Sequence, residues 1–267
     1  MKSIIVLVFT ALALFAPWPA AALEVTEFEG TAHGFPSMLD TNGKKIADGE
    51  FMQEIVGGRL SITLKYRFKH GGFRTEEKAV FRQKPELIQE EWSWRELKDG
   101  DVVRQYAVDF ETQIATAKKT ENGEKKEWSE KIEVKPGQTF TGYGFMLAVQ
   151  NLRARLVKGE AIELQAIGFT PSPKVVTVKI THVGPEEMEM ADRNPHGDHF
   201  LLQPQIPAIA KLFVKVPDTH IWLTQPPAEF LRFEGPQQEP SDPSIRVDLI
   251  SGGESGPAKA VKKSEDS

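Results

Sequence analysis

Cysteine is absent from all 267 residues of this chain. Without thiols the chain has no disulfides, no thiolate metal sites and no cysteine nucleophile, so its stability must come from a packed core. The chain also lacks an excess of basic residues. Its 33 basic and 38 acidic side chains are mixed along the sequence and give a formal net charge of -5. This balance argues against a nucleic-acid partner, which would require a basic face.

Catalytic signatures are also missing. No Gly-x-Ser-x-Gly elbow occurs, and Gly142-Tyr143-Gly144 lacks both the third glycine and the lysine of a phosphate-binding loop. Adjacent carboxylates such as Glu90 and Glu91 would point to opposite faces of a strand, which separates them too far for shared acid/base work. No cofactor is implied. We therefore expect a non-enzymatic protein.

The N-terminus carries the features of a signal peptide over residues 1–22. Lys2 is followed by an apolar stretch from residue 4 to residue 15, and residues 20–22 are alanines, which suit signal peptidase. The stretch is shorter than the ~20 residues that span a bilayer. Because no cysteine lies at the cut site, lipid attachment there is excluded. We expect cleavage before Leu23 and a soluble exported protein, periplasmic or secreted, without a transmembrane span.

The remaining chain divides into one domain and one tail. Residues 23–250 are expected to form a single β-rich domain, since no internal repeat or long linker interrupts them. Residues 251–267 contain glycine, proline, serine and charged residues with few apolar ones. Such a segment buries too little surface to offset its ordering entropy, so we expect a disordered tail.

Period-two alternation is the main structural signal in the domain. It is clearest over residues 59–69, where five apolar residues alternate with polar ones, and it predicts a strand with one buried face and one wet face. Turn residues between such stretches predict a meander of antiparallel strands. The further predicted strands cover residues 73–83, 87–97, 102–117, 128–134, 162–169, 175–183, 188–190, 201–202, 211–216, 220–224, 230–233 and 245–249.

One segment follows the helical period instead. Apolar residues recur at spacings of three, four, seven and eleven from Phe145 to Leu156, with polar residues on the other side. Thr141 is a candidate N-cap, and Gly159 is suited to end the helix. The apolar stripe must pack on something, and the buried face of the sheet is the obvious partner. The predicted fold is thus mainly β, a long curved antiparallel sheet, half-barrel-like, with one amphipathic helix packed on it.

The second half of the chain resembles a known group of proteins. The residues that carry the resemblance are 140–145 (FTGYGF), 217–223 (PDTHIWL) and 230–236 (FLRFEGP). In this order they resemble the exported bacterial β-sheet proteins that are grouped as a domain of unknown function. The sheets of that group are similar in outline to the half-barrels of periplasmic lipoprotein carriers. The resemblance implies a curved sheet wrapped on a helix, open enough for an acyl chain, with a lipid or lipoprotein as partner and no chemistry performed.

Tryptophans are the candidate ligand-binding residues. Trp92 and Trp94 are two residues apart and so project to the same face of a strand, and Trp222 lies in a late strand. Clustered tryptophans can line an apolar groove. The same residues can also be core, because a long sheet needs bulky side chains beneath its helix.

Histidines cluster once, around His196, Asp198 and His199. Two imidazoles and a carboxylate could hold a divalent cation, although the histidine spacing of three in a segment with proline and glycine differs from helical zinc motifs. The alternative interpretation is a polar hairpin turn between Met190 and Phe200, in which Asp198 accepts hydrogen bonds from the backbone.

Three functions follow from these observations. The first is an envelope protein that binds a lipid or acyl chain on the concave side of its sheet. The second is a scaffolding or protein-interaction module with a filled core and no cavity. The third is a metal-assisted hydrolase that uses residues 196–199. An open apolar cavity of several hundred Å³ favours the first, a tightly filled interface between sheet and helix favours the second, and histidines that converge on one point favour the third.

Overall fold

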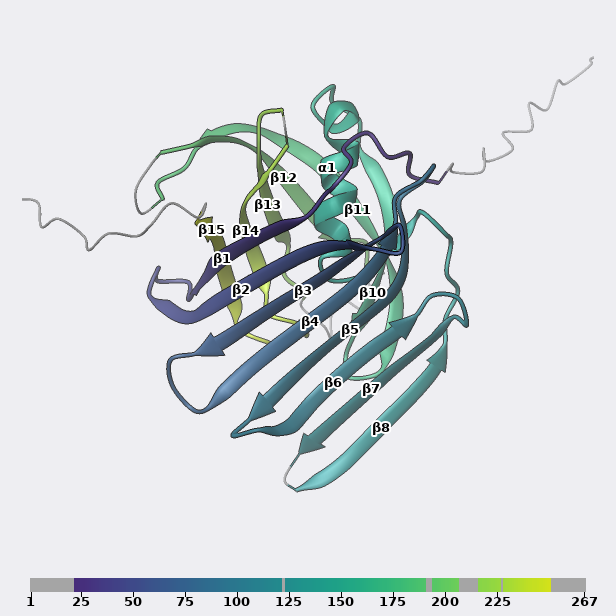
Figure 1. Ribbon diagram of the computed structural model, residues 1–267, viewed down its shortest axis with the longest axis vertical. Coiled ribbons are helices and arrows are strands. Elements are labelled where there is room, and N and C mark those ends of the chain that lie inside the picture. The colour runs from purple at the N-terminus through teal and green to yellow at the C-terminus, as the bar shows by residue number, and fades with distance from the viewer. Residues whose placement is uncertain (1–21, 122, 191–193, 207–215, 227, 251–267) are drawn as a thin grey trace, which may run out of the picture.

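A computed structural model describes residues 22–121, 123–190, 194–206, 216–226 and 228–250. Fifteen strands and one helix make up this part of the chain (Figure 1). The helix α1 spans Gly144–Leu156. The strands are β1 (Ala32–Leu39), β2 (Lys45–Val56), β3 (Arg59–Phe68), β4 (Phe73–Arg82), β5 (Ile88–Lys98), β6 (Asp101–Asp109), β7 (Ile114–Glu121), β8 (Glu124–Lys131), β9 (Thr139–Phe140), β10 (Ile162–Phe169), β11 (Pro173–Glu187), β12 (His196–Pro204), β13 (Thr219–Thr224), β14 (Phe230–Pro236) and β15 (Ser244–Ile250).

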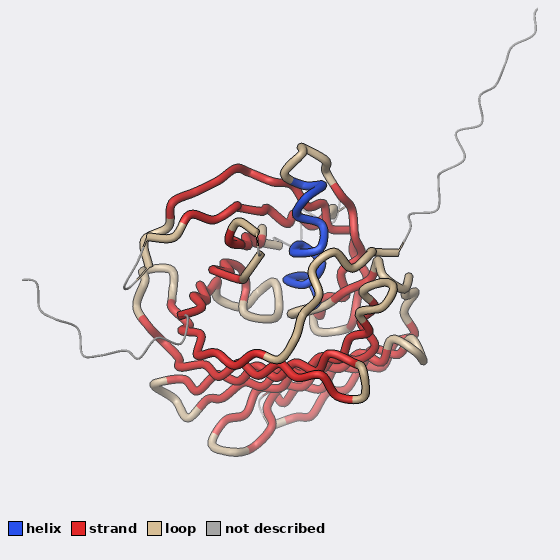
Figure 2. Tube along the Cα trace, turned by 45° about the horizontal axis from the view of Figure 1, so that its top comes forward, coloured by secondary structure: helices blue, strands red, loops and turns tan. Residues whose placement is uncertain are grey.

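All fifteen strands belong to one continuous sheet. Its order is β8-β7-β6-β5-β4-β3-β2-β1-β15-β14-β13-β12-β11-β10-β9, and every pairing is antiparallel except that of β9 with β10. The sheet curls until β11 contacts β7 and β8, but no hydrogen-bonded pairing between described residues closes it. Figure 2 shows α1 inside the resulting ring of strands. The predicted fold, a long curved antiparallel sheet with one helix, is confirmed.

The meander from β3 to β8 follows the predicted alternation, with one correction. Residues 102–117 form two strands, β6 and β7, rather than one. The chain turns at Asp109, whose Oδ1 accepts the backbone N–H groups of Glu111 and Thr112 at 3.0 Å. Gln113 completes the turn with a φ of 59°. A carboxylate that satisfies nearby backbone donors in this way favours a turn over a continued strand.

The alternation signalled no strand before residue 59, yet β1 and β2 lie at the centre of the sheet. Glycine and proline interrupt their pattern. Gly49 in β2 is needed there because a Cβ would lie 2.7 Å from the Pro36 carbonyl oxygen and 2.7 Å from the Tyr66 ring. The close approach of backbone and ring explains a glycine inside a strand.

The predicted helix is present, but its N-cap differs. The helix begins after Tyr143, and no side chain caps it from within its own segment. Thr141, the predicted cap, instead donates its hydroxyl to the Ile167 carbonyl at 2.8 Å. Gly142, with a φ of 51°, separates Thr141 from the first turn. Gly159 follows the helix with a φ of 90°, as expected for a residue that ends one.

The later strands agree with the pattern except near residues 188–199. Strand β11 ends at Glu187, so residues 188–190 do not form the predicted strand. The predicted hairpin turn around His196 is also wrong, because β12 begins at that residue and pairs with both β11 and β13. Of the strand predicted over residues 211–216, only residue 216 belongs to the described part of the chain. The predicted tail at residues 251–267 also lies outside it, as do residues 1–21 of the predicted signal peptide.

Hydrogen bonds attach the N-terminal segment, residues 23–29, to the helix. Asn151 of α1 accepts the backbone N–H groups of Thr26 and Glu27 through Oδ1, at 2.7 and 2.9 Å. Its amide nitrogen donates to the Leu147 carbonyl at 2.8 Å. This buried asparagine therefore has its hydrogen-bonding groups satisfied.

None of the helical segments in the described ranges has the length and apolar character that crossing a bilayer requires.

Candidate ligand-binding site

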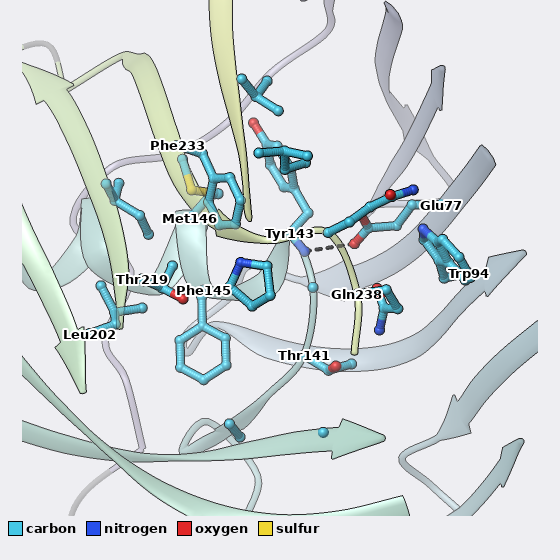
Figure 3. Close-up of a pocket in the computed structure, with 18 of the residues that line it drawn as sticks. Glu77, Trp94, Thr141, Tyr143, Phe145, Met146, Leu202, Thr219, Phe233 and Gln238 are labelled. Carbon is cyan, nitrogen blue, oxygen red and sulfur yellow. Dashed lines mark hydrogen bonds between the residues drawn. The ribbon is translucent and has the colours of Figure 1, made fainter. Parts of the chain in front are cut away.

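An apolar cavity of about 340 Å³ lies inside the curl of the sheet. Its walls come from the start of α1, from β1 to β5, and from β10 to β15. Figure 3 shows Phe145, Met146, Phe233 and Leu202 along one side of it. The volume falls at the lower end of the range for small-molecule sites, which are mostly apolar with a few polar groups.

Glu77 is the one acidic residue among the described residues that line the cavity, and Lys174 the one basic residue. Oε1 of Glu77 accepts the backbone N–H of Tyr143 at 2.7 Å and the Trp92 indole N–H at 2.8 Å. The first of these bonds is drawn in Figure 3. The carboxylate, which belongs to β4, thus caps the N-terminus of α1. The helix dipole favours negative charge at that end.

Gly142 makes this arrangement possible. A Cβ at this position would collide with the Glu77 carboxylate and the Trp92 indole, and its φ of 51° is one that side-chain-bearing residues rarely adopt. Because Gly142 has no side chain, the N-terminus of the helix, the Glu77 carboxylate and the Trp92 indole can meet at one point.

Burial raises the pKa of Glu77 above its ordinary value of 4.5, although both hydrogen bonds act in the opposite direction. The residue is enclosed by protein and keeps partial exposure that we assign to the cavity. Enclosure in a medium of low polarity disfavours the charged form, and here it outweighs the two donors.

Two tyrosines lie close to this carboxyl group. Burial, followed by the charge of Glu77, raises the pKa of Tyr66. Its hydroxyl is buried and has no hydrogen-bond partner among the described residues. Burial also raises the pKa of Tyr143, whose ring stacks on Phe51 with centroids 5.2 Å apart. The wall around Glu77 is therefore aromatic as well as apolar.

The connection between β14 and β15 crosses one side of the cavity. Gln237, Gln238 and Pro240 of this loop line it, as does Pro236 at the end of β14. The amide nitrogen of Gln237 is buried and has no partner within the described ranges. We refer to this connection, residues 237–243, as the covering loop.

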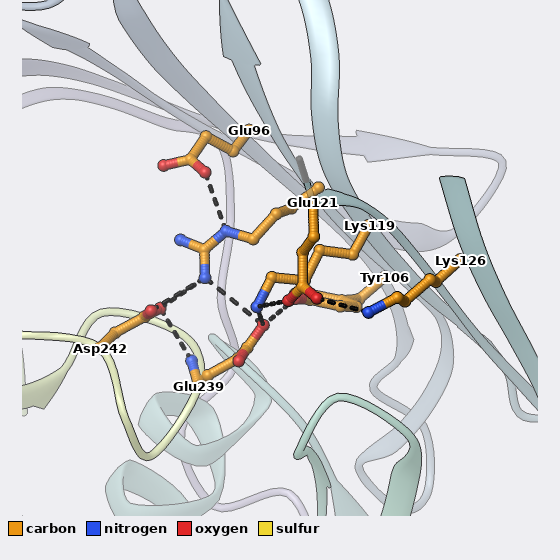
Figure 4. Close-up of polar contacts among 8 residues, drawn as sticks. Glu96, Tyr106, Lys119, Glu121, Lys126, Glu239 and Asp242 are labelled. Carbon is orange, nitrogen blue, oxygen red and sulfur yellow. Dashed lines mark hydrogen bonds and ion pairs between the residues drawn. The ribbon is translucent and has the colours of Figure 1, made fainter. Parts of the chain in front are cut away.

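A buried polar cluster holds this cover against β5, β6 and β7 (Figure 4). Arg104 lies 2.8 Å from Glu96, 2.9 Å from Asp242 and 3.5 Å from Glu239. Tyr106 donates its hydroxyl to Glu239, and Lys119 lies 3.4 Å from the same carboxylate. Although burial acts against its charge, the carboxylates around Arg104 raise its pKa. Loop residues and three strands are thus joined by charge-assisted hydrogen bonds.

The structure separates the three candidate tryptophans. Trp94 lines the cavity. Trp92 is buried beside it, stacks on Phe169 with centroids 5.6 Å apart, and reaches Glu77 through its indole nitrogen. Trp222 stacks on His199 with centroids 4.3 Å apart and is not part of the cavity wall. Only the first two therefore belong to this site.

The histidine cluster does not converge. Strand alternation in β12 places His199 on the opposite face from His196 and Asp198. Asp198 is buried, forms an ion pair with Arg153 of α1, and lies 3.2 Å from His182. His196 is exposed. The strand thus directs the three predicted ligands to different surroundings.

His199 instead meets a second histidine. Its Nε2 lies 2.9 Å from Nδ1 of His220, and its Nδ1 lies 3.5 Å from Glu186. Burial and the neighbouring His220 lower the pKa of His199. No group of three or more histidine, aspartate or glutamate side chains suited to a metal occurs in the described ranges.

Comparison with known proteins gives a likeness of fold. A crystal structure from Brucella abortus, described as a β-barrel-like protein of the domain of unknown function DUF1849, superposes with a TM-score of 0.51 at 7% identity. The likeness covers 85% of this chain and 97% of that chain, so it extends well beyond the C-terminal half. No family model and no curated protein matches the sequence. At this identity the likeness concerns the fold alone.

Glu77, Tyr66 and the covering loop escaped the sequence analysis. One signal for Glu77 was present, because it shares the face of β4 with Thr75, Ala79 and Phe81, three residues that are buried. A carboxylate on the buried face of a strand needs a partner or a function. The loop carried no such signal, because its contacts with β5 to β7 join residues more than 100 positions apart.

Proposed function

We propose that this chain is an exported, non-enzymatic protein that binds an apolar ligand, such as a lipid or acyl chain, inside its curled sheet. The observation that carries the proposal is the cavity of about 340 Å³ lined mainly by apolar side chains. A filled interface between sheet and helix would have favoured the scaffolding alternative instead. The low sequence identity of the barrel-like neighbour means that its fold supports the architecture and adds nothing about a ligand.

Apolar lining makes binding favourable because each buried methylene contributes about 0.8 kcal/mol. The cavity surrounds its contents with aliphatic and aromatic residues from several strands and from the helix. The covering loop adds three residues to this wall, which increases the surface that a ligand can bury.

Export is the second part of the proposal, and it rests on the sequence of residues 1–22. Leu23 would be the first residue after cleavage. It is buried, donates its N–H to the Gly137 carbonyl at 3.1 Å and accepts the N–H of Leu87 at 2.8 Å. A chain that begins at Leu23 keeps these bonds, so cleavage at that position is compatible with the fold.

Native mass spectrometry of the protein purified from its own compartment tests the ligand directly, and a retained lipid mass is expected. Titration of the pure protein with diphenylhexatriene, an apolar dye, measures the cavity itself. Ala166, which lines the cavity, provides the blocking variant: Ala166→Phe should weaken dye binding by about tenfold or more, since the new ring occupies the site.

Ala32→Phe is the matched control, because it adds the same ring at an exposed strand position. It should bind the dye like the wild type. A folded wild-type protein that neither retains a lipid nor binds the dye would overturn the proposal. Equal loss of dye binding in both variants would also contradict it.

A further inference from the structure

We infer that the ligand of this cavity carries a cationic, hydrogen-bond-donating head, such as a protonated amine, which binds the free oxygen of Glu77. This inference rests on the proposed function, because it names the class of molecule that the same cavity would take. Two observations carry it, the unused carboxylate oxygen and the chemistry of the surrounding wall.

Glu77 uses only one of its oxygens within the described protein. Oε1 accepts both available donors, the Tyr143 backbone N–H and the Trp92 indole N–H. Oε2 accepts no hydrogen bond from any residue in the described ranges, and Glu77 lines the cavity. An ionised carboxylate with one unsatisfied oxygen in apolar surroundings is costly, and a donor from a ligand would offset that cost.

The aromatic wall suits a cation. Tyr66, Trp94, Tyr143, Phe51 and Phe145 all line the same cavity as Glu77. The faces of aromatic rings attract cations, and this attraction strengthens when water is excluded. The unpartnered Tyr66 hydroxyl can also accept a hydrogen bond from an ammonium head.

An anionic head is disfavoured at the same place. The free carboxylate oxygen would repel it. The backbone donors at the start of the helix are already occupied, because Oε1 accepts the N–H of Tyr143 and backbone carbonyls accept those of residues 144–146. Lys174 is the single basic residue of the lining in the described chain, and it is exposed. A ligand carboxylate could pair with Lys174 only at the periphery of the cavity.

Three ligands with the same twelve-carbon chain separate the head group from the tail: dodecylamine, dodecanol and dodecanoate, each titrated below its micellar concentration. The wild type should bind dodecylamine, protonated at neutral pH, about tenfold or more tightly than dodecanoate, since charge-assisted hydrogen bonds are roughly twice as strong as neutral ones. Glu77→Gln should abolish this preference and leave dodecanol affinity unchanged.

Glutamine at position 77 can still accept both N–H groups through its own Oε1, so the helix cap is kept while the charge is removed. A purely capping role for Glu77 would therefore leave head-group preference intact in this variant. Glu54→Gln makes the same charge change at an exposed residue of β2 and should keep the preference.

The outcomes distinguish the two proposals. If dodecanoate binds the wild type as tightly as dodecylamine, or if the preference survives in Glu77→Gln, the head-group inference is wrong. Binding of dodecanol in either case leaves apolar binding standing. If none of the three ligands binds the folded protein, both proposals fail together.

Discussion

Two tryptophans in this protein donate their indole N–H to a glutamate, and the two pairs lie in opposite settings. Trp92 donates to Glu77 at 2.8 Å beside the cavity, and Trp222 donates to Glu186 at 2.9 Å on the other face of the sheet. The hydrogen bonds are nearly identical. The surroundings differ, because Glu77 is enclosed by protein whereas the Glu186 side chain is 51% exposed.

The hydrogen bond between indole and carboxylate therefore does not distinguish the two sites. Water can complete the hydrogen bonding of Glu186, so that pair needs no further partner. Glu77 is less exposed than Glu186 and lines a cavity whose wall is mostly apolar. The lower exposure of Glu77 therefore distinguishes the inner pair from the outer one, and variants that break each pair separately test this difference.

The largest expected effect comes from truncating the inner tryptophan. Trp92→Ala should lower the free energy of unfolding by about 3–5 kcal/mol, because it leaves a cavity in the main core and removes a donor from Glu77. Trp222→Ala should cost less, about 2–3 kcal/mol, since Trp222 packs with a small cluster of Met188, Met190 and Leu231. Denaturant unfolding of both variants measures the difference, and equal losses would contradict the assigned contrast.

The next effect concerns the cover. Arg104→Met should destabilise the protein by about 3 kcal/mol, because it leaves the buried Glu239 and the half-buried Asp242 without their guanidinium partner. It should also speed the entry of diphenylhexatriene, measured by stopped-flow fluorescence.

Arg95 is the outer counterpart of Arg104. It pairs with Glu76, and its side chain is 47% exposed. Arg95→Met should cost about 0.5 kcal/mol and leave the rate of dye entry unchanged. Unaltered dye entry in Arg104→Met would show that the loop does not control access.

A smaller effect follows from the raised pKa of Glu77. The folded protein holds this proton more tightly than the unfolded chain, so stability is fully present below pH 4.5 and declines as the pH rises through the folded pKa. Each unit of difference amounts to about 1.4 kcal/mol. Glu77→Gln should remove this decline, and unfolding measured from about pH 4 to about pH 9 tests it. The exposed Glu54→Gln variant should retain the wild-type profile, and an unchanged profile in Glu77→Gln would refute the assignment.

The smallest effect belongs to the outer cluster. The lowered pKa of His199 means that the unfolded chain takes up this proton more readily, so stability present above pH 6.5 is lost as the pH falls through the folded pKa. His220, His182 and Glu186 are the titratable groups that act on it. This loss should be under about 1 kcal/mol of unfolding free energy, and His199→Gln should remove it. Histidine NMR titration and denaturant unfolding measure the effect. His196 lies on the same strand but is exposed, so His196→Gln should leave the loss of stability at acidic pH unchanged.

Much of the architecture followed from local pattern. Alternation over residues 59–69 predicted β3, and the helical period from Phe145 to Leu156 predicted α1, because the geometry of each element repeats its side-chain direction at a constant interval. The pattern failed where other constraints acted. Glycine and proline masked β1 and β2, and a carboxylate turn at Asp109 divided one predicted strand into two.

Local pattern was enough to predict a long antiparallel sheet with one helix packed on it, since short-range periodicity decides which residues share a face. The tertiary structure alone decided what those faces meet. Glu77 reaches the start of α1 from 66 positions away, and the covering loop reaches Tyr106 from 133. Such contacts depend on how far the sheet curls. The curl is a property of the whole sheet and cannot be predicted from any single segment.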